Sequence, residues 1–141
     1  MDETHHRILA IWAADCAEHV LEYFEQKYSD DRRPREAIEA ACAWARGDVK
    51  TDAARPAAFA AHAAAREADD VAAISAARAA GHAAATAHVP SHAVHAATYA
   101  AKATSDAMAE REWQKQRLSQ LETEKGITLD FQALSLRSDR R

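Results

Sequence analysis

Isolated histidines and arginines in a background of alanine hold most of the chemistry in the middle of this chain. Alanine fills 38 of the 141 positions, and it offers no group that binds or reacts. At helical spacing the other residues fall into three stripes. The first is Arg55, Phe59, His62 and Arg66; the second is Ser75, Arg78, His82 and Thr86; the third is His92, His95, Tyr99 and Lys102. We hypothesise that the stripes converge on a polar pocket for an anionic or hydrogen-bonding ligand. The alternative is that alanine faces the core and the stripes face water, as amphipathicity alone predicts.

Three neighbouring histidines, His88, His92 and His95, suggest a metal site, because imidazole is a common ligand of zinc and other divalent ions. Pro90 separates His88 from the other two, and no nearby Asp, Glu or Cys completes a ligand set. We therefore expect no metal and no cofactor. A divalent ion held by these three histidines is the alternative.

Asp15 and His19 are four residues apart, so on a helix they are neighbours on one face. A carboxylate raises the pKa of an adjacent imidazole, which is the arrangement that a general base uses. The sequence marks no Ser or Thr nucleophile beside them, and Cys16 lies elsewhere on the helical wheel. We interpret the two residues as a structural pair at the edge of an apolar face, with acid–base chemistry as the alternative.

Apolar residues that recur at helical spacing predict the helices that position these side chains. The predicted helices cover residues 4–28, 34–46, 55–66, 70–87, 91–104 and 106–121. Pro34 suits the first turn of a helix and Gly47 suits the residue after one, whereas the residue before Pro90 disfavours the helical region. Because Pro56 lacks the N–H that a helix interior uses, we expect its helix to begin near Arg55 or to have a distorted first turn.

Helices joined by short loops predict an all-α fold, a single-domain bundle of about six helices. We expect the bundle domain to cover residues 1–121 and residues 122–141 to form a tail that is either docked or flexible. The large side chains expected in the core are Trp12, Phe24, Trp44 and Trp113. Close contacts lined by alanine are expected to fill the rest.

Charge and composition exclude several classes of protein. The net charge is −4, and residues 1–31 hold eight Asp and Glu against two Lys and Arg, so a basic nucleic-acid-binding face is not expected. No apolar run reaches 18 residues, the N-terminus lacks the order of a secretory signal, and the two cysteines sit in helical patterns. These features predict a cytoplasmic protein without nucleic-acid or membrane partners. A homodimer stays open as an alternative.

Acidic side chains form a further stripe on the first predicted helix, at Asp15, Glu18, Glu22 and Glu25. This stripe could dock a basic partner and raise the association rate by electrostatic steering. The alternative, which we favour, is a solvated helix face.

Five blocks of the sequence, in order, resemble the Imm-5-like family of immunity proteins. The blocks are HRILAIWAADCAEHVLEYFE, RPREAIEAACAWARG, AFAAHAAAREA, AARAAGHAAATAHVPSHAVHAATYAAKA and EREWQKQRL. The resemblance covers about residues 5–121. The resemblance implies an all-helical cytoplasmic bacterial protein that protects its host against a toxin. The family's characteristic residues would fall here on Trp12, Asp15, Cys16, His19, His62, Arg66, Glu67, His82, His88 and His92.

The function expected from these observations is self-protection by binding a toxin or a toxic small molecule without catalysis. The alternative is a small histidine-rich enzyme or metal-dependent protein that uses a polar pocket between helices. The candidate ligand-binding residues are Trp12, Asp15, His19, His62, Arg66, His82, His88, His92 and Tyr99. We expect His82 to be largely buried and hydrogen-bonded, with Asp15, His19 or His62 among its partners.

Overall fold

Helices account for nearly all of residues 1–129, which is the part of the chain that the computed structural model describes. The helices are α1 (Glu3–Val20), α2 (Glu22–Glu25), α3 (Arg33–Arg46), α4 (Thr51–Glu67), α5 (Val71–Ala85), α6 (His92–Ala103) and α7 (Ala107–Lys125). No strand occurs among these described residues, so the predicted all-α fold is confirmed. None of these helices is long and apolar enough to span a membrane.

The first predicted helix, 4–28, is divided in the structure, which gives seven helices in residues 1–129 where about six were predicted. α1 ends at Val20, and the N–H of Leu21 donates to the carbonyl of Glu18 instead of to a residue four positions back. This tighter turn begins the four-residue helix α2. The apolar spacing continues through the turn, because Phe24 is buried with the residues of α1, so periodicity alone did not reveal the break.

The start of α4 corrects another prediction, because this helix begins at Thr51 and contains Pro56. Pro56 is the sixth residue of α4, so it removes the one hydrogen bond that an N–H at this position would donate to the carbonyl of Asp52. Thr51 is held from outside the helix, since the indole Nε1 of Trp44 donates to its hydroxyl oxygen at 3.0 Å. Gly47 ends α3 with a φ of 83°, as its position predicted.

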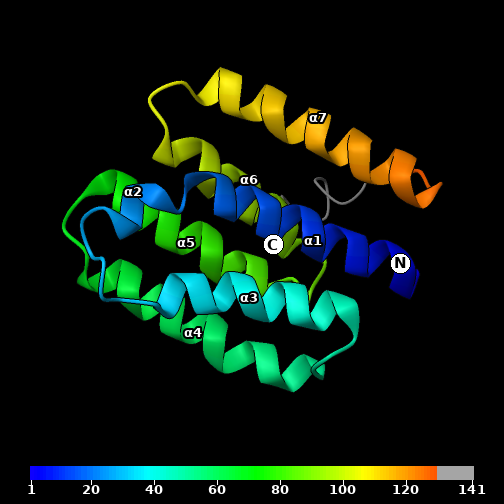
Figure 1. Ribbon diagram of the computed structural model, residues 1–141, viewed down its shortest axis with the longest axis horizontal. Helices are drawn as coiled ribbons and strands as arrows, with labels where there is room; N and C mark the ends of the chain where they lie inside the picture. Colours follow the sequence, from blue (N-terminus) through cyan, green and yellow to red (C-terminus); the bar gives the residue numbers. More distant parts are fainter. Residues whose placement is uncertain (130–141) are drawn as a thin grey trace.

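α5 is the central helix and packs against α1, α2, α3, α4 and α6. In Figure 1 it lies between α4 on one side of the molecule and α6 and α1 on the other. Its buried residues are Ala73, Ser75, Ala76, Ala77, Ala79, Ala80, Gly81, Ala83 and Ala84. Side chains this small allow the neighbouring helices to come close, so the alanine content of the chain is the basis of its packing.

α7 lies outermost, along α6 and α1 (Figure 1). Its buried residues are Glu110, Gln114, Leu118 and Leu121. After Gly126 the chain turns back, and the N–H of the buried Leu129 donates to the carboxylate of Glu122 at 2.8 Å. Residues 122–125, which were predicted to belong to a tail over 122–141, are instead part of α7, which continues to Lys125. Residues 130–141 lie outside the described part of the chain.

Three of the four predicted core anchors are buried. Trp12, Phe24 and Trp44 are between 1% and 5% exposed. Trp113 is only partly buried, because its ring covers His19 at the edge of the core.

Candidate functional site

Aromatic rings from three helices converge on one cluster, which we call the histidine cluster. Its members are His62 of α4, His82 of α5, and His92, His95 and Tyr99 of α6. The His82 ring is at the centre, with ring centroids 4.9 Å from His62, 5.2 Å from His92 and from His95, and 5.3 Å from Tyr99. The rings of the three stripes therefore converge, and the hypothesis that they line a pocket for a ligand stays a prediction.

Helical spacing and one glycine bring these rings together. His92, His95 and Tyr99 are separated by three and four residues, which places them on one face of α6. On α5, Gly81 precedes His82, and a Cβ atom at Gly81 would lie 2.7 Å from the His62 ring. The glycine thus leaves the space in which the His62 ring packs against α5.

The imidazoles at the centre of the cluster are held neutral. Burial, followed by the charges of Arg78 and Arg66, lowers the pKa of His62 to about 4. Burial, followed by the neighbouring histidines, lowers the pKa of His82 to about 3. Arg78 donates from its guanidinium to Nδ1 of His62 at 2.9 Å, which fixes that nitrogen as an acceptor.

His82 is half-buried, and its Nδ1 lies 3.0 Å from Nδ1 of His92. One of these two nitrogens carries the proton and the other accepts it. The expected partners Asp15 and His19 lie elsewhere, while His62 is a neighbour through its ring edge. The prediction of a hydrogen-bonded His82 holds, but its partner is a residue of α6.

Cations surround the cluster. Arg78 and Arg66 both act on His62, and the Lys102 ammonium lies 4.9 Å from the centre of the Tyr99 ring. The ionisable groups that lower the pKa of His62 and His82 are all bases. Such a site favours an anion, because a negative charge there would be attracted by Arg66 and Arg78.

The other candidate residues lie where α1 meets α7. Asp15 accepts from Nε of Arg117 at 2.7 Å, and Nδ1 of His19 lies 2.7 Å from the Glu110 carboxylate. The interpretation of Asp15 and His19 as a structural pair is therefore wrong, because each of them pairs with a residue of α7.

His19 combines a buried support with an exposed ring. The Glu110 side chain is 7% exposed, whereas the His19 side chain is 40% exposed. The imidazole stacks on Trp113 with the ring centroids 3.7 Å apart and the planes 6° from parallel. Glu110 thus fixes Nδ1, and the other ring nitrogen stays available for a further contact.

Glu110 is a site residue that the sequence did not predict, because no residue near it in the chain marks it as part of a pair. Glu110 and His19 are 91 residues apart, and no local spacing connects them. A buried carboxylate requires a partner, but its burial is visible only once α7 is docked on α1.

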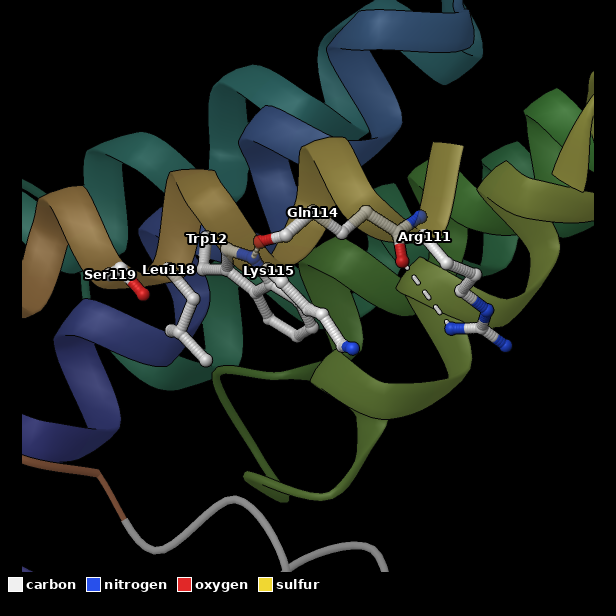
Figure 2. Close-up of a pocket in the computed structure, with 6 residues that line it drawn as sticks. All are labelled: Trp12, Arg111, Gln114, Lys115, Leu118 and Ser119. Atoms are coloured by element: carbon white, nitrogen blue, oxygen red, sulfur yellow. Dashed lines mark hydrogen bonds between the residues drawn. The ribbon is translucent and has the colours of Figure 1, made fainter. Parts of the chain in front are cut away.

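A cavity of about 470 Å³ lies between α1 and α7. It is lined by Trp12, Arg111, Gln114, Lys115, Leu118 and Ser119 (Figure 2). The indole Nε1 of Trp12 donates to the backbone carbonyl of Gln114 at 2.9 Å, and the Gln114 amide donates to the carbonyl of Ala97 at 2.8 Å. Trp12 therefore belongs to this cavity and not to the histidine cluster.

His88 lies apart from the histidine cluster. Arg55 approaches it with Nε 3.4 Å from the ring Nε2, and burial together with this cation lowers the pKa of His88. The alternative of a metal at His88, His92 and His95 is not supported, because residues 1–129 contain no group of three or more His, Cys, Asp or Glu that could hold a metal ion.

Arginines occupy much of the acidic stripe of α1 and α2. Arg35 makes two hydrogen bonds of 2.8 Å with the Glu25 carboxylate and lies 3.6 Å from Glu18. Since Asp15 is paired with Arg117, this stripe is less available to a basic partner than the sequence suggested.

The comparisons with known proteins give one family. Residues 1–123 match the family described as Imm-5 like putative immunity protein. No curated protein and no solved structure matches the chain significantly.

Proposed function

The chain belongs to the Imm-5-like family of immunity proteins, and from this membership we propose that it protects its host by binding a toxin, with the histidine cluster as the docking site. The mode of action we propose is stoichiometric neutralisation without a catalysed reaction. Its natural partner is a toxin that carries exposed carboxylates.

The observation that carries this proposal is the charge of the cluster. Arg66 and Arg78 both lower the pKa of His62, and within residues 1–129 neither guanidinium forms an ion pair. A carboxylate of the partner would pair with the arginines and would restore the pKa of the histidines toward their ordinary range. Charge complementarity of this kind contributes most to specificity and association rate.

Exposed apolar surface next to the cluster supports a protein partner. Phe59 is 65% exposed and lies one helical turn before His62 on α4. Aromatic and arginine side chains are enriched at the energetic centres of protein interfaces. Phe59, the arginines and the histidine rings together form a surface of that composition.

The test is protection followed by direct binding. Candidate toxins encoded near the gene for this chain are expressed in a bacterial host with and without it, and growth identifies the toxin that it neutralises. Titration calorimetry of the purified pair should give one toxin per chain. The double variant Arg66→Gln/Arg78→Gln should bind at least tenfold more weakly, and the wild-type affinity should fall as salt rises.

A matched control removes a charge elsewhere. Arg32 is exposed at the start of α3, 3.8 Å from Glu39, and Arg32→Gln should change the affinity less than twofold. Unchanged binding by the double variant would place the interface on another face.

A second candidate function rests on His19. The Glu110 carboxylate orients its imidazole through Nδ1, which is how a carboxylate prepares a histidine as a general base. An enzyme would neutralise many equivalents of toxin, whereas a binding protein neutralises one. Substoichiometric protection that His19→Asn abolishes and His82→Gln preserves would establish this alternative.

A further inference from the structure

The cavity between α1 and α7 has an apolar floor and a cationic mouth. Trp12 and Leu118 are buried, 2% and 9% exposed, and Figure 2 shows the indole ring between Leu118 and Lys115. Arg111, Lys115 and the small Ser119 are exposed along the rim. A ligand here would meet apolar surface at one end and two positive charges at the other.

The two cations at the mouth are not neutralised within the described chain. None of the six residues that line the cavity is acidic. Arg111 donates to the Thr98 hydroxyl at 3.1 Å and to the Gln114 side-chain carbonyl at 3.3 Å, and both acceptors are uncharged. Within residues 1–129, Lys115 is not among the residues that form ion pairs or side-chain hydrogen bonds.

Arg111 and Lys115 lie between this cavity and a neighbouring hollow of different composition. A shallower hollow on the same side of α7 shares Arg111 and Lys115 and includes Glu112 and Met108. The acid therefore lies beyond the cations and not on the apolar floor. A ligand would therefore bind with its apolar body on the floor of the cavity and its anionic group at the mouth, next to Arg111 and Lys115.

We propose that this cavity binds a small apolar carboxylate, a molecule with an aliphatic or aromatic body and a single carboxylate group. The volume of about 470 Å³ lies within the roughly 300–1,000 Å³ typical of small-molecule sites. The body packs on Trp12 and Leu118, and the carboxylate pairs with Lys115 and Arg111. Because the site is separate from the histidine cluster, the proposal does not depend on how a toxin docks.

Decanoate is a suitable probe, and decanol is its uncharged counterpart. The Trp12 indole N–H donates a hydrogen bond to a backbone carbonyl of α7 at the cavity. The Trp44 indole, near the end of α3, donates instead to the Thr51 hydroxyl and does not line the cavity. In nitrogen–proton correlation spectra of the full chain, Trp44→Phe and Trp113→Phe assign the three indole signals. Decanoate should shift the Trp12 signal and saturate at one equivalent, with the Trp44 signal unmoved, and decanol should require at least tenfold higher concentration.

Variants on exposed positions separate the charge of the site from its shape. Lys115→Gln/Arg111→Gln should weaken decanoate binding about tenfold and leave decanol binding unchanged, while Lys125→Gln at the end of α7 should alter neither. Ser119→Phe places a ring at the rim and should abolish the shift by both probes. Circular dichroism verifies that each variant is folded.

Three results would overturn the proposal. They are a Trp12 signal that does not move with decanoate, equal affinities of the wild-type chain for decanoate and decanol, and wild-type affinity in folded Ser119→Phe.

Discussion

Two regions of this bundle hold their helices together by different means. One is the contact of α5 with α4 and α6, and the other is the contact of α7 with α1 and α6. At α5 the buried side chains are almost all alanine, so the helices approach closely and the large polar residues are displaced to the common edge, where they form the histidine cluster. At α7 two of the four buried residues, Glu110 and Gln114, are polar, and specific hydrogen bonds hold the helix. The fit of small side chains therefore holds α5 in place, whereas hydrogen bonds between polar side chains and their partners hold α7.

This difference has consequences for function. A contact made of small side chains tolerates little change in volume, and its alanines carry no group that titrates, so its response to pH comes from the histidine cluster at its edge. A contact made of charged pairs depends on the partner of each group, because a buried polar atom left alone is costly. The two contacts should therefore respond to different perturbations.

The largest effect is expected from added volume at the centre of α5. Ala80 is fully buried, and Ala80→Leu would force neighbouring helices apart, with an expected loss of about 3 kcal/mol of unfolding free energy. Urea unfolding measures the loss. The exposed Ala53 provides the matched control, since Ala53→Leu should cost under about 0.5 kcal/mol. Equal effects at the two positions would mean that α5 is not tightly packed.

Removal of a partner should loosen α7 selectively. Glu110→Ala deletes the carboxylate that holds His19, with an expected loss of about 2 kcal/mol. Amide hydrogen exchange should accelerate along α7 and remain slow in α5. The exposed Glu112 on the same helix is the control, and Glu112→Ala should leave exchange unchanged. If Glu110→Ala accelerates exchange throughout the chain, α7 is not a separate unit of stability.

Low pH should act mainly through the histidine cluster. The pKa of His62 is about 4 and that of His82 about 3, both below the ordinary 6.5. In the unfolded chain both side chains take up protons near pH 6.5, whereas in the folded chain His62 and His82 do not. Their contribution to the free energy of unfolding is therefore fully present above pH 6.5 and is lost as pH falls toward 4. Because both side chains are partly exposed to solvent, the two histidines together should account for a loss on the order of 2 kcal/mol between pH 7 and pH 5.

The measurement is urea unfolding at several pH values for the wild-type chain and for His62→Gln/His82→Gln. The double variant should show a flatter dependence between pH 7 and pH 5. The same slope in both proteins would mean that other groups control the acid response.

The parts of this architecture that sequence could predict are those with local signals. Asp70 and Asp106 accept from N–H groups of the first turns of α5 and α7, and Gly47 ends α3 in the left-handed region. The exceptions depend on contacts between helices. Thr51 begins α4 because Trp44 holds it, and Glu110 is buried because His19 meets it across 91 residues.

The candidate site was predicted in part for the same reason. Helical spacing placed His92 and Tyr99 on one face of α6, so the convergence of the stripes could be inferred. Which helix each stripe would meet depends on packing, and packing separated Asp15 and His19 from the other candidates by directing them to α7.

The smallest net effect is expected where the two kinds of packing meet, at Gly81. Alanine there should favour α5 by about 1 kcal/mol through helix propensity. Its Cβ would also lie 2.7 Å from the His62 ring, so the ring must turn away and lose the hydrogen bond from Arg78. Since the lost bond costs about 1 kcal/mol, Gly81→Ala should leave stability nearly unchanged.

A double-mutant cycle separates these opposing contributions. In a His62→Ala background no ring is displaced, so Gly81→Ala should stabilise the chain by about 1 kcal/mol, measured by urea unfolding. The imidazole proton signals of His62 should move in the single variant Gly81→Ala, because the ring leaves its place against α5. The same stabilisation in both backgrounds would show that the glycine is not required by the histidine, and that α4 and α5 approach each other through alanine alone.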